Sequence, residues 1–255
     1  MRSGCHSEPP RQLPGAGAAG YTRPIQPRLG RVVSVPSPSP SPLAAPVEQI
    51  DAAHIRAGLQ RALRIVDRHA PALTRLDAVL GDGDHGDNLS TGFRAVEQLL
   101  AELPPETLPG DLLRAVGHRL VATVGGASGP LYGTAFIEAG FRAGDAEVLE
   151  PALVAEMLLA AAAGLARRGR SAVGDKTILD TLGPAAEAFA AAVASGGSAA
   201  EAQQAAVAGG RDGMRGTRSL VARRGLALRL GERSIGHLDP GAVSCFLLLI
   251  ALAER

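Results

Sequence analysis

The stretch LDAVLGDGDHGDN, residues 76–88, separates two segments in which apolar residues recur at three- and four-residue steps. Leu59 and Leu63 are one such pair upstream of it. Because this period places apolar side chains on one face of an α-helix, we expect a helix on each side of the stretch. The upstream helix should begin at Val47 and end at Pro71, since proline disrupts a helix interior. The helices expected after it are at residues 88–103, 110–124, 130–143, 150–168, 177–195, 198–222 and 239–254.

The composition favours helices and excludes an all-β protein. Hydrophobic residues make up 46% of the chain, but aromatic residues only 3%, and tryptophan is absent. Alanine supplies much of the apolar share and favours helices, whereas strands are enriched in β-branched and aromatic residues. The longest apolar run, residues 243–253 with Ser244 inside it, is shorter than the roughly 18 residues that a membrane span needs. A net charge of +1 provides no cationic face for nucleic acid.

The beginning of the chain differs in composition from the rest. Residues 1–46 contain ten of the eighteen prolines, and five arginines against one acidic residue. Such a segment cannot propagate a helix or bury a core, so we expect a disordered extension followed by one helical domain at residues 47–255. The extension lacks the continuous apolar stretch of a secretory signal. Two cysteines, Cys5 and Cys245, cannot form a disulfide framework, which favours a reducing compartment and a cytoplasmic location.

Four polar connections that contain glycine lie between the expected helices. They are residues 76–88, 125–130, 169–177 and 225–241. Short connections make consecutive helices antiparallel, which predicts an all-α fold, an eight-helix antiparallel up-and-down barrel. In such a barrel every second connection lies at the same end, and these four follow the first, third, fifth and seventh helices. We therefore expect them to form a composite site at one end.

The first connection has the composition of a metal site. Asp77, Asp82, Asp84 and Asp87 crowd a short stretch whose glycines allow tight folding. Carboxylates so close repel one another unless a hard cation neutralises them, and Mg²⁺ prefers such oxygen ligands together with phosphate oxygens. A calcium EF-hand is excluded, because a loop starting at Asp82 has aspartate where glycine is required and Phe93 where glutamate is required. The alternative interpretation is a solvated acidic turn.

The second and third connections have features of phosphate sites. Residues 125–130, GGASGP, place free N–H groups at a helix start, which suits an anion, although a simple corner between helices has the same pattern. Residues 169–177, GRSAVGDKT, resemble a Walker loop, but Asp175 interrupts the motif and an alanine-rich helix precedes it, so we reject a P-loop fold. Lys176 is the single lysine of the chain. It is either a cation for the ligand or a surface residue near a helix cap.

The last connection is dense in polar groups just before the most apolar helix. Asp239 and Pro240 suffice for a helix cap, so Arg233 and His237 favour contact with a ligand. His85 and His237 are each a candidate general base or a hydrogen-bond donor of a loop.

Four motifs in these connections resemble the ADP-binding L subunit of dihydroxyacetone kinase. The same domain occurs at the C-terminus of single-chain ATP-dependent dihydroxyacetone kinases. The motifs are LDAVLGDGDHGDN at 76–88, VGGASGPLYGT at 124–134, VGDKTILDTLGPA at 173–185 and LGERSIGHLDPGA at 230–242. Their order and their spread over residues 47–255 make the resemblance specific. It implies an eight-helix barrel with the nucleotide at one end.

The resemblance also implies roles for individual residues. Asp77, Asp82 and Asp84 would hold two Mg²⁺ ions that bridge the phosphates of ADP or ATP, and these aspartates and His85 would be the catalytic residues. The residues implied to contact the nucleotide are His85, Asn88, Ala127, Ser128, Gly174, Gly183, Asp239, Pro240 and Gly241. The chain departs from the family at Asp87, which adds negative charge, and at Leu226, where the family commonly has arginine. Arg229 is the candidate replacement for that arginine.

The implied function is phosphoryl transfer in a dihydroxyacetone (glycerone) kinase of glycerol metabolism. In this family a separate K subunit or domain holds the ketone, and nothing resembling it fits into residues 1–46, so we expect a K subunit as partner. The donor is either ATP or phosphoenolpyruvate relayed by a phosphotransferase-system protein, and a homodimer is a further expectation. The alternatives are a subunit of a kinase for another short ketose, such as erythrulose, and a nucleotide-dependent regulatory module. We expect neither nucleic acid nor a membrane as partner.

Overall fold

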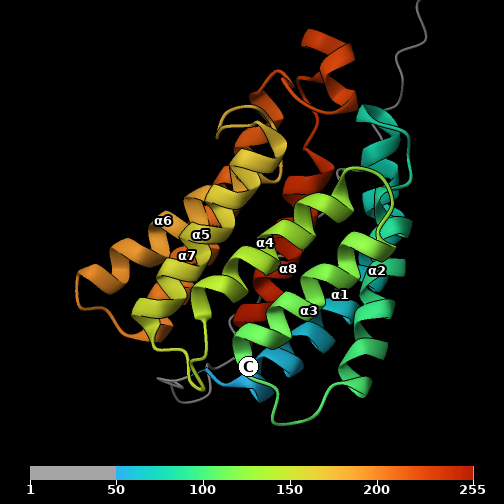
Figure 1. The fold of residues 1–255 in the computed structure, drawn as a ribbon. Coiled ribbons are helices and arrows are strands. Elements are labelled where there is room, and N and C mark those ends of the chain that lie inside the picture. Colours follow the sequence, from blue (N-terminus) through green and yellow to red (C-terminus); the bar gives the residue numbers. More distant parts are fainter. Residues whose placement is uncertain (1–49, 255) are drawn as a thin grey trace, which may run out of the picture. The chain divides into compact units, whose positions relative to one another are not determined.

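The computed structural model of the chain describes residues 50–254, which form eight α-helices and two 3₁₀-helices (Figure 1). The α-helices are α1 (Ala52–Leu80), α2 (His85–Glu102), α3 (Pro109–Thr123), α4 (Ser128–Ala143), α5 (Pro151–Gly169), α6 (Leu179–Ala194), α7 (Ala199–Gly216) and α8 (Pro240–Ala253). The 3₁₀-helices η1 (Thr217–Ser219) and η2 (Leu226–Ser234) lie between α7 and α8. Apart from an isolated β-bridge between Ile50 and Leu149, the described residues contain no strand. The all-α prediction is confirmed.

The helices form a closed ring. Each α-helix packs against the next one along the chain, and α8 packs against α1. Arg61 of α1 strengthens this closure by donating its Nε–H to the carbonyl oxygen of Ala251, 2.9 Å away. The chain runs up and down, so the connections α1–α2, α3–α4, α5–α6 and α7–α8 all lie at the upper end in Figure 1. The predicted eight-helix barrel is thus confirmed.

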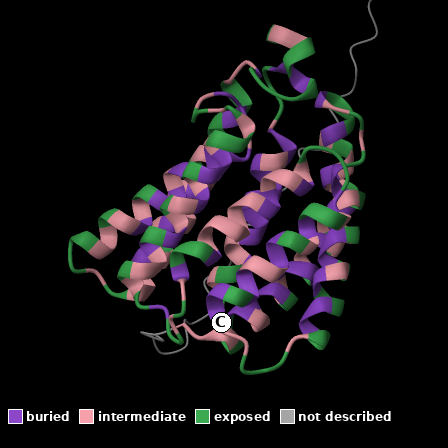
Figure 2. Ribbon diagram, in the orientation of Figure 1, coloured by how far each residue is buried: buried purple, intermediate pink, exposed green. Residues whose placement is uncertain are grey.

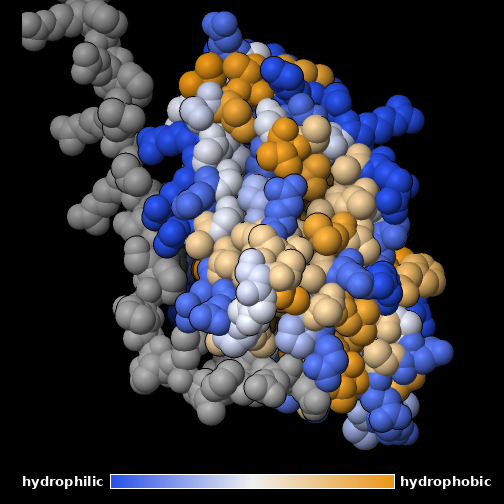
Figure 3. All heavy atoms as spheres, turned by 90° about the vertical axis from the view of Figure 1, so that its left-hand side faces the viewer, coloured by the Kyte–Doolittle hydropathy of each residue, from blue (hydrophilic) through white to orange (hydrophobic). Residues whose placement is uncertain are grey.

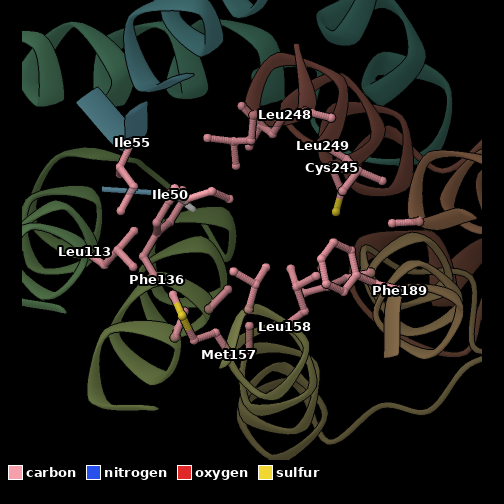
Figure 4. Close-up of a pocket in the computed structure, with 18 of the residues that line it drawn as sticks. Ile50, Ile55, Leu113, Phe136, Met157, Leu158, Phe189, Cys245, Leu248 and Leu249 are labelled. Atoms are coloured by element: carbon pink, nitrogen blue, oxygen red, sulfur yellow. The ribbon is translucent and has the colours of Figure 1, made fainter. Parts of the chain in front are cut away.

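The helices turn their apolar faces inward, and a partly open apolar cavity lies between them. Figure 2 shows that buried residues follow the inner faces, and in α8 every residue from Ala242 to Leu248 is buried. The cavity has a volume of about 500 Å³. Figure 4 shows apolar side chains around it, among them Leu113, Phe136, Met157, Phe189 and Leu248. None of the aspartates of residues 76–88 lines this cavity.

Two helix boundaries predicted from the sequence are wrong. The first helix does not end at Pro71 but continues through it to Leu80. Proline forfeits one backbone hydrogen bond, to the carbonyl of Asp67, but Leu73 and Leu80 beyond it are buried, and their packing holds the helix together. At the other boundary, α7 ends at Gly216 and not at residue 222, because η1 begins there.

Two further expectations concern the ends of the chain and membranes. The extension expected at residues 1–46 lies outside the described residues, as do residues 47–49 and 255. Within the described part, no helix has the length and apolar character needed to cross a membrane.

Candidate functional site

Three aspartates form a compact carboxylate cluster at the upper end of the barrel. Asp77 is buried in the last turn of α1, and Asp82 and Asp84 are exposed in the connection to α2. One ligand oxygen from each lies within 4.8 Å of the others. Two oxygens on opposite sides of one Mg²⁺ ion lie about 4.2 Å apart, so a small inward movement of the exposed side chains gives magnesium geometry. The hard oxygen donors and their spacing therefore fit Mg²⁺.

Asp77 is held in place by the start of α2. Its Oδ2 accepts hydrogen bonds from the backbone N–H groups of Gly83, Asp84 and His85, at 2.9, 3.0 and 3.2 Å. Gly83 has a φ of +78°, a conformation that side chains other than glycine rarely adopt, and this allows the loop to wrap around the carboxylate. One oxygen of Asp77 thus orders the loop, which leaves Oδ1 as its candidate metal ligand.

The structure corrects the extent of this connection. The sequence placed all four aspartates of residues 76–88 in one loop, but only residues 81–84 lie between the helices. Asp87 lies on the exposed side of the first turn of α2 and is outside the carboxylate cluster of Asp77, Asp82 and Asp84. Helix α1 therefore fixes the position of Asp77, and helix α2 places Asp87 outside the carboxylate cluster.

His85 joins the carboxylate cluster to α4 and α8. It is buried, with Nδ1 3.0 Å from Ser128 Oγ and Nε2 2.7 Å from Ser244 Oγ. Tyr132 of α4 lies 2.7 Å from the same Ser244 hydroxyl. Burial lowers the pKa of His85, although the charge of Asp77 opposes this, so the neutral imidazole is favoured near neutral pH. Ser244 and Tyr132 were missed in the sequence because both stand inside apolar helices.

The α3–α4 connection brings Ala127 and Ser128 next to α2. Gly125, Gly126 and Ala127 are exposed, and Ser128 begins α4. Asn88 lies against Gly125, where an added Cβ would be 2.8 Å from its Oδ1. Asn88, Ser128 and His85 therefore lie close together, beside the N–H groups at the start of α4.

The α5–α6 connection is organised by a residue that the sequence analysis missed. Asp180 is buried and accepts hydrogen bonds from the N–H groups of Gly174 and Thr177, at 2.6 and 2.7 Å. The three-residue spacing from Thr177 to Asp180, which resembles a capping box, was the available signal. Gly183 lies one turn further along α6, where an added Cβ would be 2.8 Å from the side chain of Val173. Gly183 thus permits a close approach to Val173, whereas Gly174 is required for its backbone conformation, with a φ of +99°.

Lys176 does not lie at the surface, which was one of the two alternatives that the sequence left open. It is 1% exposed, so it is not a surface residue. Its Nζ donates hydrogen bonds to the carbonyl oxygens of Thr217 and His237, each at 2.6 Å. Two of its three N–H donors are therefore directed at the backbone of the α7–α8 connection.

The last connection places Asp239 at the start of α8. Its Oδ2 accepts a hydrogen bond from the N–H of Ala242 at 2.8 Å, and Pro240 is the first residue of the helix. Burial raises the pKa of Asp239 to about 7. His237 and Arg229 are exposed, the latter on η2, and among the described residues Arg229 makes no hydrogen bond or ion pair with the groups above. Sequence reasoning correctly placed the four connections together but left the position of Arg229 relative to them open.

This combination defines a class of protein. An all-α ring whose one end carries a carboxylate cluster, several exposed N–H groups and four polar connections is a helical domain built to bind a cation together with an anionic ligand. A family model described as the DAK2 domain matches residues 79–254. The chain belongs to the DAK2 domain family.

Known proteins similar to the chain include an ADP-binding kinase subunit, a longer kinase and a kinase of known structure. The "PEP-dependent dihydroxyacetone kinase 2, ADP-binding subunit DhaL" of Listeria innocua is 40% identical over 81% of this chain and 95% of the relative. The "D-erythrulose kinase" of Mycolicibacterium smegmatis is 34% identical over 78% of this chain but only 36% of that protein. The dihydroxyacetone kinase of C. freundii, solved with AMP-PNP and Mg²⁺, is 25% identical with a TM-score of 0.61, and the match covers 89% of this chain and 38% of that chain.

Proposed function

We propose that this chain is the nucleotide- and Mg²⁺-binding subunit of a dihydroxyacetone kinase, and that it works with a separate K subunit that holds the ketone. The observation that carries the proposal is the Asp77, Asp82 and Asp84 cluster at the end of the barrel where the four connections meet. The similarity to an ADP-binding subunit over 95% of that relative's length supports the same assignment.

The proposed site consists of two metal positions and a nucleotide position. Asp77, Asp82 and Asp84 hold two Mg²⁺ ions, and these aspartates together with His85 form the catalytic group. The proposed nucleotide contacts are His85, Asn88, Ala127, Ser128, Gly174, Gly183, Arg229, Asp239, Pro240 and Gly241. The ions supply charge neutralisation for the phosphates during in-line transfer to the substrate hydroxyl.

The protein residues have distinct tasks in this proposal. Asp77 is fixed by three N–H groups, so its carboxylate is preorganised for a cation. His85 is fixed by Ser128 and Ser244, and it contacts the phosphates in place of, or through, the hydroxyl of Ser128. The N–H groups at the start of α4 face developing negative charge. The reacting hydroxyl belongs to the ketone that the K subunit holds.

Three finer points belong to the same proposal. The phosphoryl donor is ATP or a phosphotransferase-system protein that relays phosphate from phosphoenolpyruvate, and the Listeria relative is named as PEP-dependent. The location that fits either donor is the cytoplasm. We retain a homodimer as the assembly to test by light scattering.

Calorimetry and a reconstituted assay test the proposal. ADP should bind to the purified chain only with Mg²⁺, and the chain should form dihydroxyacetone phosphate when it is mixed with a K subunit, dihydroxyacetone and one of the two donors. Failure to bind nucleotide with Mg²⁺ present contradicts the proposal. Transfer to erythrulose but not to dihydroxyacetone favours the erythrulose kinase subunit, which the Mycolicibacterium relative supports as second candidate. Nucleotide binding without transfer to either ketose favours a regulatory module.

A further inference from the structure

The α7–α8 connection forms a lid segment, defined here as residues 217–239, whose two ends are joined. The N–H of Gly236 donates to the carbonyl oxygen of Arg218 at 2.7 Å, and Arg218 Nε–H donates back to the carbonyl oxygen of Gly236 at 3.0 Å. The N–H of Asp239 donates to Thr217 Oγ1 at 3.1 Å. These bonds make the lid segment a loop with a closed base.

The lid segment lies against the end of α1. Its residues Ala222, Ala227 and Leu230 pack on Leu80, the last residue of the helix that carries Asp77. The upper end of the molecule in Figure 3, where Figure 1 places the lid segment, shows hydrophilic and apolar side chains side by side. Leu226 and Leu228 are 41% and 54% exposed there. The lid segment is therefore attached to the barrel by a small apolar contact and by its base.

Lys176 forms hydrogen bonds to both sides of the base of the lid segment. Its ammonium group donates to Thr217 O at the first residue of the lid segment and to His237 O near its last, each at 2.6 Å. It thereby connects the residues at which the chain enters the lid segment with those at which it leaves. Lys176 itself has a φ of +63°, which is unfavourable for a residue with a side chain and is held by the surrounding contacts.

The neighbouring Asp175 holds the lid segment at a second point. Its carbonyl oxygen accepts from the N–H of Arg223 at 3.0 Å, and its carboxylate lies 3.3 Å from Arg224 Nε. Asp175 is the residue that interrupts the Walker pattern in the sequence. The two residues of the Walker-like sequence, Asp175 and Lys176, thus bind the lid segment in this protein.

The buried ammonium group of Lys176 lies near the carboxyl groups of Asp180 and Asp239. Burial lowers the pKa of Lys176, and Asp239 and Asp180 act in the opposite direction. A buried ammonium that loses its acceptors is costly, so the bonds to Thr217 O and His237 O open together with the base or not at all.

We infer that Lys176 is a positioning residue that anchors the lid segment, and that opening of this anchor sets the rate at which nucleotide leaves. The inference rests on the proposed function, because the proposed contacts Arg229 and Asp239 lie in the lid segment. Lys176 does not touch the phosphates in this scheme. It acts by keeping the base closed.

The single lysine makes the wild-type protein its own reporter. An amine-acetylating reagent modifies Lys176 only when the anchor opens, and mass spectrometry of the peptide that contains it gives the rate, with the same chain in urea as the reference. We expect acetylation to be about a hundredfold slower in the folded protein than in urea. If nucleotide prevents opening, ADP with Mg²⁺ at about ten times its Kd should slow the reaction about tenfold further.

Each outcome of this experiment separates the two proposals. If calorimetry shows ADP bound but acetylation stays at the nucleotide-free rate, the inference about Lys176 is overturned and the proposed function stands. If calorimetry shows no binding of ADP with Mg²⁺, the proposed function fails. Acetylation of Lys176 in the folded chain as fast as in urea overturns the anchor by itself.

Variants test the consequence for nucleotide release. Lys176→Met keeps the length of the side chain and removes its donors, and it should release a fluorescent ADP analogue about ten- to a hundredfold faster. Lys176→Arg restores a cation and donors and should recover part of that loss. Trypsin should cut Lys176→Met faster at Arg223, in the lid segment, but not at Arg211 of α7.

The matched control is a core variant far from the lid segment. Leu112→Ala on α3, where the side chain is fully buried, lowers the melting temperature without touching the anchor. The inference fails if this control, compared at equal melting temperature, releases nucleotide as fast as Lys176→Met. If Lys176→Met does not fold, the acetylation experiment on the wild-type chain decides the question.

Discussion

At the scale of single residues, Asp77 differs from the two other carboxylates of its cluster. It is buried and accepts three backbone hydrogen bonds, whereas Asp82 and Asp84 are exposed. Its side chain therefore contributes to folding as well as to the candidate metal site. The exposed pair, in contrast, gains strong partners only when a cation is present.

This difference predicts opposite results for two substitutions. Asp77→Ala should reduce the free energy of unfolding by about 2–3 kcal/mol without any Mg²⁺, because three N–H groups lose their acceptor. Asp82→Asn should change it by less than about 0.5 kcal/mol yet abolish Mg²⁺-dependent ADP binding. Urea unfolding and calorimetry measure the two effects. Wild-type ADP affinity in Asp82→Asn would exclude this aspartate as a metal ligand.

Asp239 gives the fold a specific pH dependence. Its pKa is raised from 3.8 to about 7 by burial, so the folded state holds a proton that the unfolded state releases near pH 4. Between about pH 4 and pH 7 the folded state binds more protons, and stability falls as the pH rises, by about 1.4 kcal/mol per unit. Above pH 7 the penalty is constant.

Asp239→Asn tests this, since the amide oxygen can still accept from Ala242 N–H and does not titrate. The variant should match the wild-type protein near pH 4.5 and be more stable at pH 8, as measured by urea unfolding at both pH values. An equal difference in stability at the two pH values would show that the buried carboxylate does not titrate in this range.

At the scale of elements, close helix contacts at glycines keep the metal-binding loop in place. Gly86 in the first turn of α2 approaches α1 so closely that an added Cβ would be 2.0 Å from the carbonyl oxygen of Ala70. The backbone atoms cannot yield easily, because both helices are packed in the ring. The contact therefore sets the distance between Asp77 on α1 and Asp84 just before α2.

We expect Gly86→Ala to lower the free energy of unfolding by more than about 2 kcal/mol and to weaken Mg²⁺ binding, because α1 and α2 must separate. Gly216→Ala is the matched control. Gly216 has a helical φ of −57° and nothing within 4 Å of an added Cβ. Alanine there should stabilise the protein by about 0.4–1 kcal/mol. Thermal unfolding of both variants checks the opposite signs, and equal destabilisation by both would contradict the packing argument.

The spacing of apolar residues in the sequence predicts most of the fold. Where a predicted helix boundary is wrong, tertiary packing is the reason. The eight helices follow from apolar spacing, which is a local signal. Pro71 is misleading locally, because Leu73 and Leu80 beyond it are buried, and Leu80 packs on Ala222, Ala227 and Leu230, which lie far away in the sequence. Boundaries such as the end of α7 depend in the same way on what the following residues contact.

At the scale of the whole molecule, topology alone indicated that four connections meet at one end. It could not indicate that Lys176 is buried, since its acceptors are backbone carbonyls of Thr217 and His237, whose positions no side-chain pattern encodes. Ser244 was hidden for a related reason, because a serine within an apolar helix carries no signal until His85 is placed beside it. Residue types thus predicted the metal cluster well and the hydrogen-bonded supports around it poorly.

The last prediction concerns how long the assembled molecule keeps its nucleotide. Leu226 begins η2 where the resemblance to the dihydroxyacetone kinase L subunit implies an arginine, and the loss of a charge-assisted bond to phosphate would speed release by about ten- to a hundredfold. Arg229 follows three residues later, and in a 3₁₀-helix residues three apart lie on the same side, so it can supply part of the missing contact. We expect this chain to exchange ADP with free ATP instead of retaining it.

Four measurements decide this. The purified chain should carry less than stoichiometric ADP after dialysis, Leu226→Arg should slow release, and Arg229→Ala should speed it. With a K subunit and dihydroxyacetone, ATP alone should support turnover. Stoichiometric ADP that survives extensive dialysis, together with no turnover on ATP, would instead make the nucleotide a resident coenzyme that is rephosphorylated in place, because a site that never empties cannot use ATP as an ordinary substrate.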